Sequence, residues 1–137
     1  MRYLAIDQGH KRIGLALCDA EETMASPLKI IENGPLLFQQ IREVVQEYGI
    51  EAFVVGLPYN MDGTEGPRAV EVRRFAEKLM QTIPLPLDFF DERLSSFQAE
   101  EKLTGLDLTR KGKKKRMDAV AAAAIFQNFL DSKKQNE

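Results

Sequence analysis

Apolar residues follow two different patterns along the chain, and the change occurs near residue 33. Before it, three short apolar segments cover residues 3–7, 12–19 and 27–32, and polar residues separate them. Short links between segments of this kind are typical of antiparallel strands joined by tight turns. The N-terminal part of the sequence therefore predicts a three-stranded meander.

After residue 33 the spacing alternates between that of helices and that of strands. A helix is expected to begin at 33–35, because Pro35 suits a first turn and the apolar residues that follow share one face: Leu37, Ile41, Val44, Val45 and Tyr48. The nearly continuous apolar run 52–56 predicts a central parallel strand.

The remaining residues predict a second helix from Pro67, a fifth strand over 85–90 and two further helices. Pro86 in the fifth strand favours a sheet edge or an early strand position. Ser95 and Gln98 have the spacing of a capping box for a short helix. An alanine-rich helix is expected from about residue 117 to 130.

These elements predict one α/β domain over residues 1–137, with 132–137 as a frayed C-terminal tail. Right-handed crossovers and short connections give a five-stranded mixed sheet in the order 3-2-1-4-5, flanked by helices. In such a sheet the carboxyl ends of the first and fourth strands open on a common crevice.

Composition narrows the class of protein. The 137 residues are 44% hydrophobic and 29% charged, which is typical of a soluble globular protein and excludes disordered and fibrous chains. Cys18 is the single cysteine, so an intrachain disulfide and a cysteine-rich zinc site are excluded. No apolar run approaches the ~20 residues of a membrane span, and the early charges do not resemble a signal peptide. We expect a cytoplasmic protein without a membrane partner.

Charge is distributed unevenly. The net charge is −2, yet residues 110–116 hold six basic side chains, and without them 13 basic residues face 21 acidic ones. A run of like charges is often only solvated surface, but beside acidic residues it also suits a polyanion. We expect an exposed, mobile loop that binds nucleic acid through Arg110, Lys111, Lys113, Lys114, Lys115 and Arg116.

Acidic residues end several of the predicted elements. Asp7 ends the first strand, Asp91 and Glu92 end the fifth, and Asp118 lies in the first turn of the last helix. Carboxylates from separate elements are the ligands that Mg²⁺ or Mn²⁺ prefers, and two such ions can act on a phosphodiester. Taken singly, each acid could equally mark the end of the core or favour a helix dipole.

Three motifs resemble a known family. The segment AIDQGHKRIGLAL (5–17) resembles the D-x-G-x-x-x-x-G opening of ribonuclease H-like and actin-like folds. The segments VGLPYNMDGTEG (55–66) and DERLSS (91–96) resemble the signature blocks of the YqgF/RuvX family, and the similarity extends from residue 3 to about 129. The resemblance implies a ribonuclease H-like fold, a nuclease acting on pre-16S rRNA or Holliday junctions, and a metal-binding, catalytic triad of Asp7, Glu92 and Asp118.

The resemblance leaves some roles open. The family usually has an aromatic residue and a threonine where this chain has Gln8 and His10, so His10 is either an exposed turn residue or a phosphate contact. The polar segment 58–64 is either a βα connection or a substrate-facing loop. Arg93 could pair with a neighbouring acid or meet a phosphate. Further candidate nucleic-acid contacts are Lys11, Arg12, Asn60 and Arg93.

The leading hypothesis is a metal-dependent nuclease that matures the 5′ end of precursor 16S rRNA, with structured RNA and the small ribosomal subunit as partners. The alternatives are a resolvase acting on branched DNA and a ribosome assembly factor without turnover. A resolvase would favour a twofold dimer. No dimer signature is evident, so we expect a monomer or weak dimer. An actin-like phosphotransferase generally needs two such domains, for which 137 residues are too few.

Overall fold

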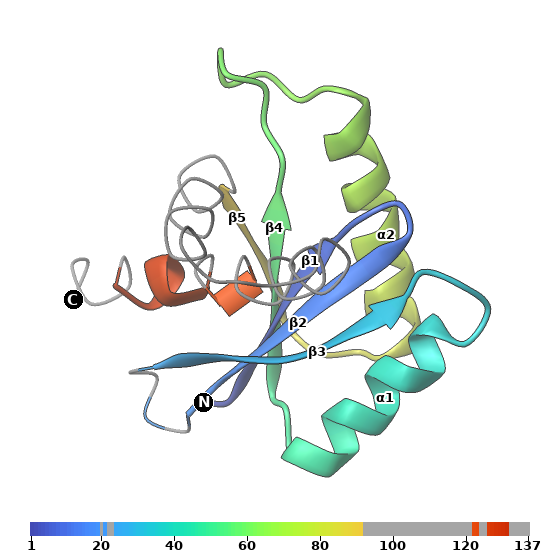
Figure 1. Ribbon diagram of the computed structural model, residues 1–137, viewed down its shortest axis with the longest axis vertical. Coiled ribbons are helices and arrows are strands. Elements are labelled where there is room, and N and C mark those ends of the chain that lie inside the picture. Colours follow the sequence, from blue (N-terminus) through green and yellow to red (C-terminus); the bar gives the residue numbers. More distant parts are fainter. Residues whose placement is uncertain (20, 22–23, 92–121, 124–125, 132–137) are drawn as a thin grey trace, which may run out of the picture.

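A five-stranded mixed sheet organises the residues that the computed structural model describes, which are 1–19, 21, 24–91, 122–123 and 126–131. The order is β3-β2-β1-β4-β5, which confirms the predicted topology (Figure 1). The strands are β1 (Tyr3–Gln8), β2 (Arg12–Cys18), β3 (Ala25–Glu32), β4 (Ala52–Leu57) and β5 (Leu87–Asp91).

The first strand lies at the centre of the sheet. It pairs antiparallel with β2, with Asp7 opposite Gly14, and parallel with β4, with Ile6 beside Val55. Every residue of β4 is buried, as expected for a central strand covered on both faces. Because β1, β4 and β5 are parallel, their carboxyl ends meet at one edge of the molecule.

Two helices cover one face of this sheet. The first, α1 (Leu37–Tyr48), begins two residues after Pro35 and is capped at its C-terminus by Gly49, whose φ of 64° gives the left-handed turn that glycine tolerates. The second, α2 (Pro67–Thr82), begins at the predicted proline. Large side chains of the strands pack beneath them, including Leu4, Ile6, Ile13, Leu15, Phe53 and Val55.

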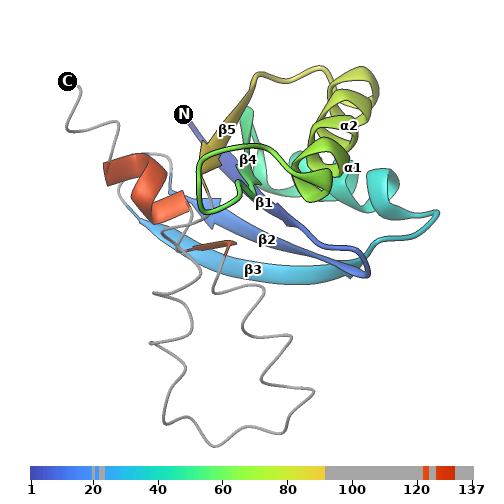
Figure 2. The same cartoon turned by 90° about the horizontal axis from the view of Figure 1, so that it is seen from above.

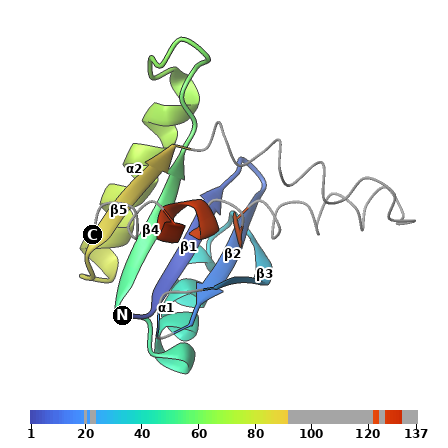
Figure 3. The same ribbon diagram turned by 90° about the vertical axis from the view of Figure 1, so that its left-hand side faces the viewer.

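The opposite face is packed by the C-terminal segment. Residues 122–123 and 126–131 are helical, in agreement with the expected alanine-rich helix, and they lie across the sheet from α1 and α2 (Figures 2 and 3). The ring centroids of Phe126 and Tyr3 lie 5.5 Å apart, and Gln127 Oε1 accepts a 3.1 Å hydrogen bond from the Ala25 backbone amide. The sheet residues on this face are mostly small: Ala5, Ala16, Cys18, Ala52 and Val54 accompany Tyr3.

The strand ends differ slightly from the sequence expectation. The third strand begins at Ala25 rather than 27, and it pairs across Pro27 with a register shift between Leu15 and Ala16 of β2. The fifth strand begins after Pro86, whose carbonyl accepts the Phe53 amide at 2.8 Å, and it is an edge strand as predicted. No helix within the described ranges is long and apolar enough to cross a membrane.

Candidate functional site

Asp7 occupies the carboxyl end of the central strand. Tyr3 and Ala5 pack on the face that the C-terminal helix covers, and side chains alternate along a strand, so Asp7 belongs to the same face. Its cross-strand neighbour is Gly14, which has no side chain. The half-buried Asp7 carboxylate therefore lies beside a position that leaves room for a ligand.

Arg12 lies on the same face as Asp7. Ala16 and Cys18 of β2 pack against the C-terminal helix, and Arg12 has the same parity in that strand. Its Nη1 atom is buried and has no hydrogen-bond partner in the part of the chain described. A buried guanidinium nitrogen without an acceptor is costly, so an anionic oxygen from a ligand would stabilise it. This placement fits the predicted nucleic-acid contact.

The turn between β1 and β2 is held by several hydrogen bonds. The Gly9 amide donates to the Arg12 carbonyl at 2.9 Å, and a Cβ on Gly9 would lie 2.6 Å from that oxygen, so the position requires glycine. Asn33 Nδ2 donates to the carbonyls of Gly9 and His10 at 3.0 and 3.2 Å. Lys11, a predicted nucleic-acid contact, lies exposed on this turn.

His10 is an exposed turn residue, with 68% of its side chain accessible. Its Nδ1 lies 3.4 Å from Glu71 Oε2, and its Nε2 lies 3.4 Å from Arg68 Nη1. The structure thus supports the turn interpretation, although the ring faces charged groups of α2.

Arg68 is a residue that the sequence analysis missed. Its Nη2 donates to the Gln8 carbonyl at 2.6 Å, and its Nη1 donates to Glu71 Oε2 at 2.6 Å. Arg68 therefore ties the beginning of α2 to the end of β1. No sequence signal could have indicated this, because the bond joins residues 60 positions apart.

The β4–α2 loop, residues 58–66, is an ordered hairpin. The backbones of Tyr59 and Glu65 form an isolated antiparallel β-bridge, and the Asn60 backbone amide donates a hydrogen bond to the Thr64 carbonyl at 2.8 Å. Asn60 Nδ2 also donates to Thr64 Oγ1 at 3.0 Å, and Asp62 Oδ1 accepts from the Thr64 amide and hydroxyl at 3.0 and 2.6 Å. Asn60, a predicted nucleic-acid contact, therefore shapes the loop. Both of the proposed roles for this segment remain compatible with that geometry.

An ion pair fixes this loop to α2. Arg73 Nε donates to Glu65 Oε1 at 2.5 Å and its Nη2 to Oε2 at 3.2 Å, while its guanidinium lies 5.0 Å from the Phe89 ring centre. The hydrogen bond from Arg73 lowers the pKa of Glu65 and raises that of Arg73, against the opposing effect of burial. Arg73 thus connects the loop, α2 and β5. The tip of the loop reaches into solvent, where Met61 is 91% exposed.

The other predicted site residues lie outside the described residues. The strand β5 ends at Asp91, immediately before Glu92 in the sequence. Glu92, Arg93, Asp118 and the basic segment 110–116 are not among the residues described, and neither is the expected capping pair at 95 and 98. Within the described ranges no cluster of three or more metal-ligating side chains occurs. The convergence of the three acids therefore stays a prediction.

Comparisons with known proteins identify relatives over nearly the whole chain. A family model described as "RuvX: Holliday junction resolvase" matches residues 1–132. A protein named "Putative pre-16S rRNA nuclease" from Geobacillus thermodenitrificans is 44% identical over 98% of this chain and 100% of its own length. A protein of the same name from Caldanaerobacter subterraneus subsp. tengcongensis is 41% identical over 99% and 100%.

Solved structures share the fold at low sequence identity. A T. thermophilus RuvC in complex with a Holliday junction substrate superimposes with a TM-score of 0.61 at 17% identity, covering 98% of this chain and 96% of that one. The fowlpox virus Holliday junction resolvase gives a TM-score of 0.56 at 10% identity, covering 96% and 99%. These likenesses establish the architecture that the sheet order already indicated.

Proposed function

Because the chain belongs to the RuvX family, we propose that it is a metal-dependent nuclease that processes the 5′ end of precursor 16S rRNA in the cytoplasm. The observation that carries the proposal is the placement of Asp7 at the carboxyl end of the central strand, beside Gly14 and on the face of Arg12. The choice of RNA rests on the names of relatives that are 41–44% identical over their whole length.

The metal ligands in this proposal are Asp7, Glu92 and Asp118. Phe90, two residues before Glu92, packs against the same cluster as Tyr3, which is the face of Asp7. Ala122 is buried in that cluster too, and in the helix that the sequence predicts from about residue 117 it would follow Asp118 by four positions, a separation that places residues on one side of a helix. Both relationships favour convergence of the three carboxylates.

The donor set suits Mg²⁺ or Mn²⁺, because it contains hard oxygen ligands without Cys or His. Such ions, when bound, would neutralise charge on the phosphodiester and activate water for its attack. Arg12 would hold a phosphate oxygen with its buried Nη1, and Gly14 would let the nucleic-acid backbone approach Asp7. No nucleophile from the protein is needed in this scheme.

A second candidate, cleavage of Holliday junctions, is favoured by the description of the matching family model. Both candidates use the same acidic residues and differ in substrate. Incubating the purified protein with precursor rRNA and with a four-way DNA junction, each with Mg²⁺ or Mn²⁺, separates them. We expect cleavage of the rRNA precursor, and selective cleavage of the junction would favour the second candidate.

Asp7→Asn tests the metal site in the same assay. We expect the cleavage rate to fall by at least about a hundredfold, since even supporting residues of metal sites affect activity 10–100-fold. RNA affinity should stay near that of the wild type or become slightly tighter, because a repulsive charge is lost. Asp88→Asn is the matched control, since it removes an exposed carboxylate within β5. Wild-type cleavage by Asp7→Asn would contradict the assignment.

The complementary variant replaces Lys113, Lys114 and Lys115 with Ala. Three lost phosphate contacts should lower the slope of log affinity against log salt by about 2–3. The single-turnover rate at saturating RNA should change little, because these cations serve affinity rather than chemistry. A salt titration identical to that of the wild type would reduce the basic segment to a solvated tail.

A further inference from the structure

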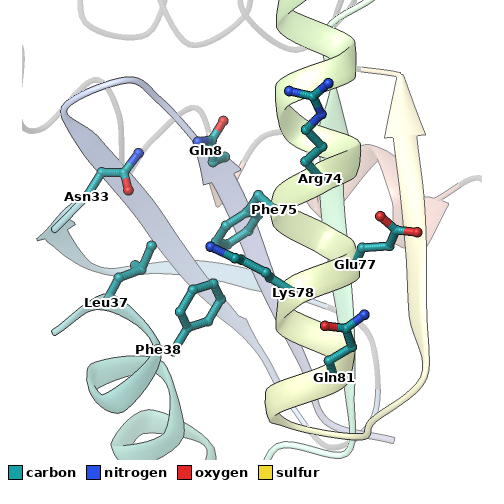
Figure 4. Close-up of a pocket in the computed structure, with 9 residues that line it drawn as sticks. All are labelled: Gln8, Asn33, Leu37, Phe38, Arg74, Phe75, Glu77, Lys78 and Gln81. Atoms are coloured by element: carbon teal, nitrogen blue, oxygen red, sulfur yellow. The ribbon is translucent and has the colours of Figure 1, made fainter. Parts of the chain in front are cut away.

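A pocket of about 470 Å³ lies between α1, α2 and the end of β1 (Figure 4). This volume is within the range of ~300–1,000 Å³ that small ligands occupy. Phe38 and Phe75 form its aromatic wall, with ring centres 5.8 Å apart and planes inclined by 22°. The pocket belongs to the α1/α2 face, opposite the face of Asp7, so it is separate from the proposed metal site.

Two cations of α2 border the pocket. Arg74 and Lys78 are four residues apart and so lie on one side of the helix, where two like charges destabilise it. Neither side chain forms a hydrogen bond or an ion pair with any other residue that the structure describes. In Figure 4 Lys78 extends across the pocket toward α1, Arg74 points away from Lys78, and Glu77 points to the other side of the helix. An anion in the pocket would therefore be attracted by two cations that border it from different directions.

Gln8, which lines the pocket at the carboxyl end of β1, supplies an unused acceptor. Its side-chain Oε1 is buried and has no hydrogen-bond partner within the described ranges. The backbone carbonyl of Gln8, and not its amide, accepts the bond from Arg68. A buried acceptor without a donor is unfavourable, so a ligand N–H at this point would be stabilising.

We propose that this pocket binds one nucleotide unit, either from a single-stranded segment of the substrate or as a free nucleotide. The base would pack against Phe38 and Phe75, an N–H group of the base would donate to Gln8 Oε1, and the phosphate would lie between Arg74 and Lys78. Aromatic stacking and backbone cations are the usual combination for binding single strands.

The single-stranded form of this proposal rests on the proposed function. Asp7 and Gln8 are consecutive residues of β1, and they belong to opposite faces of the sheet at its carboxyl end. A strand held at Asp7 could thus continue around the exposed Lys11 turn toward the pocket. Substrate bound at both faces would be held on either side of the cleavage point.

The test measures the affinity of the full chain for two probes, a labelled single-stranded RNA tetranucleotide and adenosine monophosphate, in Mg²⁺-free buffer. Phe38→Leu keeps an apolar side chain but removes the ring, and it should weaken binding about five- to tenfold, as expected for loss of one stacked base. Lys78→Gln should weaken binding and lower the salt slope by about 0.7 for a lost phosphate contact. Lys29→Gln, which removes an exposed lysine of β3, is the matched control and should bind like the wild type.

Two-dimensional NMR of the labelled protein locates the ligand directly. Binding that shifts the Gln8 side-chain amide and is weakened by Phe38→Leu and Lys78→Gln supports the proposal, whichever probe binds. Competition between the two probes indicates a strand-end or single-strand site, and binding of the monophosphate alone indicates a free nucleotide. Affinity unaffected by both variants, or shifts confined to the Asp7 face, would overturn it.

Cleavage by Asp7→Asn is measured separately, so failure of the nuclease proposal is distinguishable from failure of the pocket. If the pocket binds the probes and Asp7→Asn still cleaves RNA, only the assignment of Asp7 as a metal ligand is contradicted. Thermal melts of Phe38→Leu and Lys78→Gln verify that each variant is folded at the assay temperature.

Discussion

The two faces of the sheet are built from side chains of different size. Beneath α1 and α2 the strands contribute large residues such as Leu4, Ile6 and Phe53. Toward the C-terminal helix they contribute Ala5, Ala16 and Ala52. Among the described strand residues, the first face thus carries the larger apolar side chains, whereas the second allows a helix to approach the backbone closely. Asp7 belongs to the second face, so the candidate chemistry lies where the described strand residues are mostly small.

The largest effect is expected from removing bulk beneath α1 and α2. Phe53 is fully buried, so Phe53→Ala should lower the free energy of unfolding by about 3–5 kcal/mol through lost burial and the cavity that remains. Phe53→Leu, which keeps most of the volume, should cost less than about 1.5 kcal/mol. Urea denaturation followed by circular dichroism measures both. A cost below about 1 kcal/mol for the alanine variant would mean that this face is not the main core.

Adding side-chain volume tests the face of the sheet that the C-terminal helix covers. Ala5→Leu adds volume where the C-terminal helix packs, and overpacking of this kind costs about 1–3 kcal/mol. We also expect faster hydrogen exchange for the amides of residues 126–131, because the helix would be displaced. Ile6→Leu, a change of shape on the other face, is the control and should leave that exchange unaltered. Unchanged hydrogen exchange in Ala5→Leu would show that the larger side chain fits between the sheet and the C-terminal helix without displacing that helix.

Sequence periodicity was sufficient to predict the order of the strands in the sheet. The strand order followed from two short links and two crossovers, and so did the position of Asp7 at the end of the central strand, whereas the face that Asp7 shares with Arg12 became evident only from the packing of β1 and β2. The beginning of α1 was predicted at 33–35 and lies at Leu37, two to four residues later, because proline is favoured near a helix start without fixing its first residue.

Other features depend on contacts between distant segments. The bond from Arg68 to the Gln8 carbonyl joins α2 to β1, and neither residue has a local pattern that would indicate it. The pocket beside Phe38 likewise requires α1, α2 and β1 together. Local periodicity predicts which face a residue occupies, but it does not predict which side chains meet across elements.

The smallest effect concerns the rim, where α2 is joined to its preceding loop by charge rather than by burial. Arg73 lowers the pKa of Glu65, so this carboxylate should titrate below its ordinary value of 4.5 in a carbon-detected NMR titration. A lowered pKa in the folded state stabilises the fold above the unfolded pKa, and that stabilisation is lost as the pH falls through the folded pKa.

Arg73→Gln should return the Glu65 titration toward its ordinary value. Arg42→Gln is the matched control, because Arg42 donates its hydrogen bond to the Thr82 carbonyl and not to Glu65. This variant should leave the pKa of Glu65 unchanged. Because both members of the pair are solvent-exposed, added salt should also weaken the shift. If Arg73→Gln leaves the pKa of Glu65 unchanged, the ion pair is not what links the loop to α2.

The outer strands of the sheet also affect how copies of the protein meet one another. Pro27 interrupts the hydrogen-bonding capacity of β3, and the register shift beside it distorts that edge. At the other side, β5 is only five residues long and follows directly after Pro86. Short strands, prolines and irregular pairing make poor templates for a strand from another molecule. The same features that end the sheet thus disfavour strand pairing between copies of this protein.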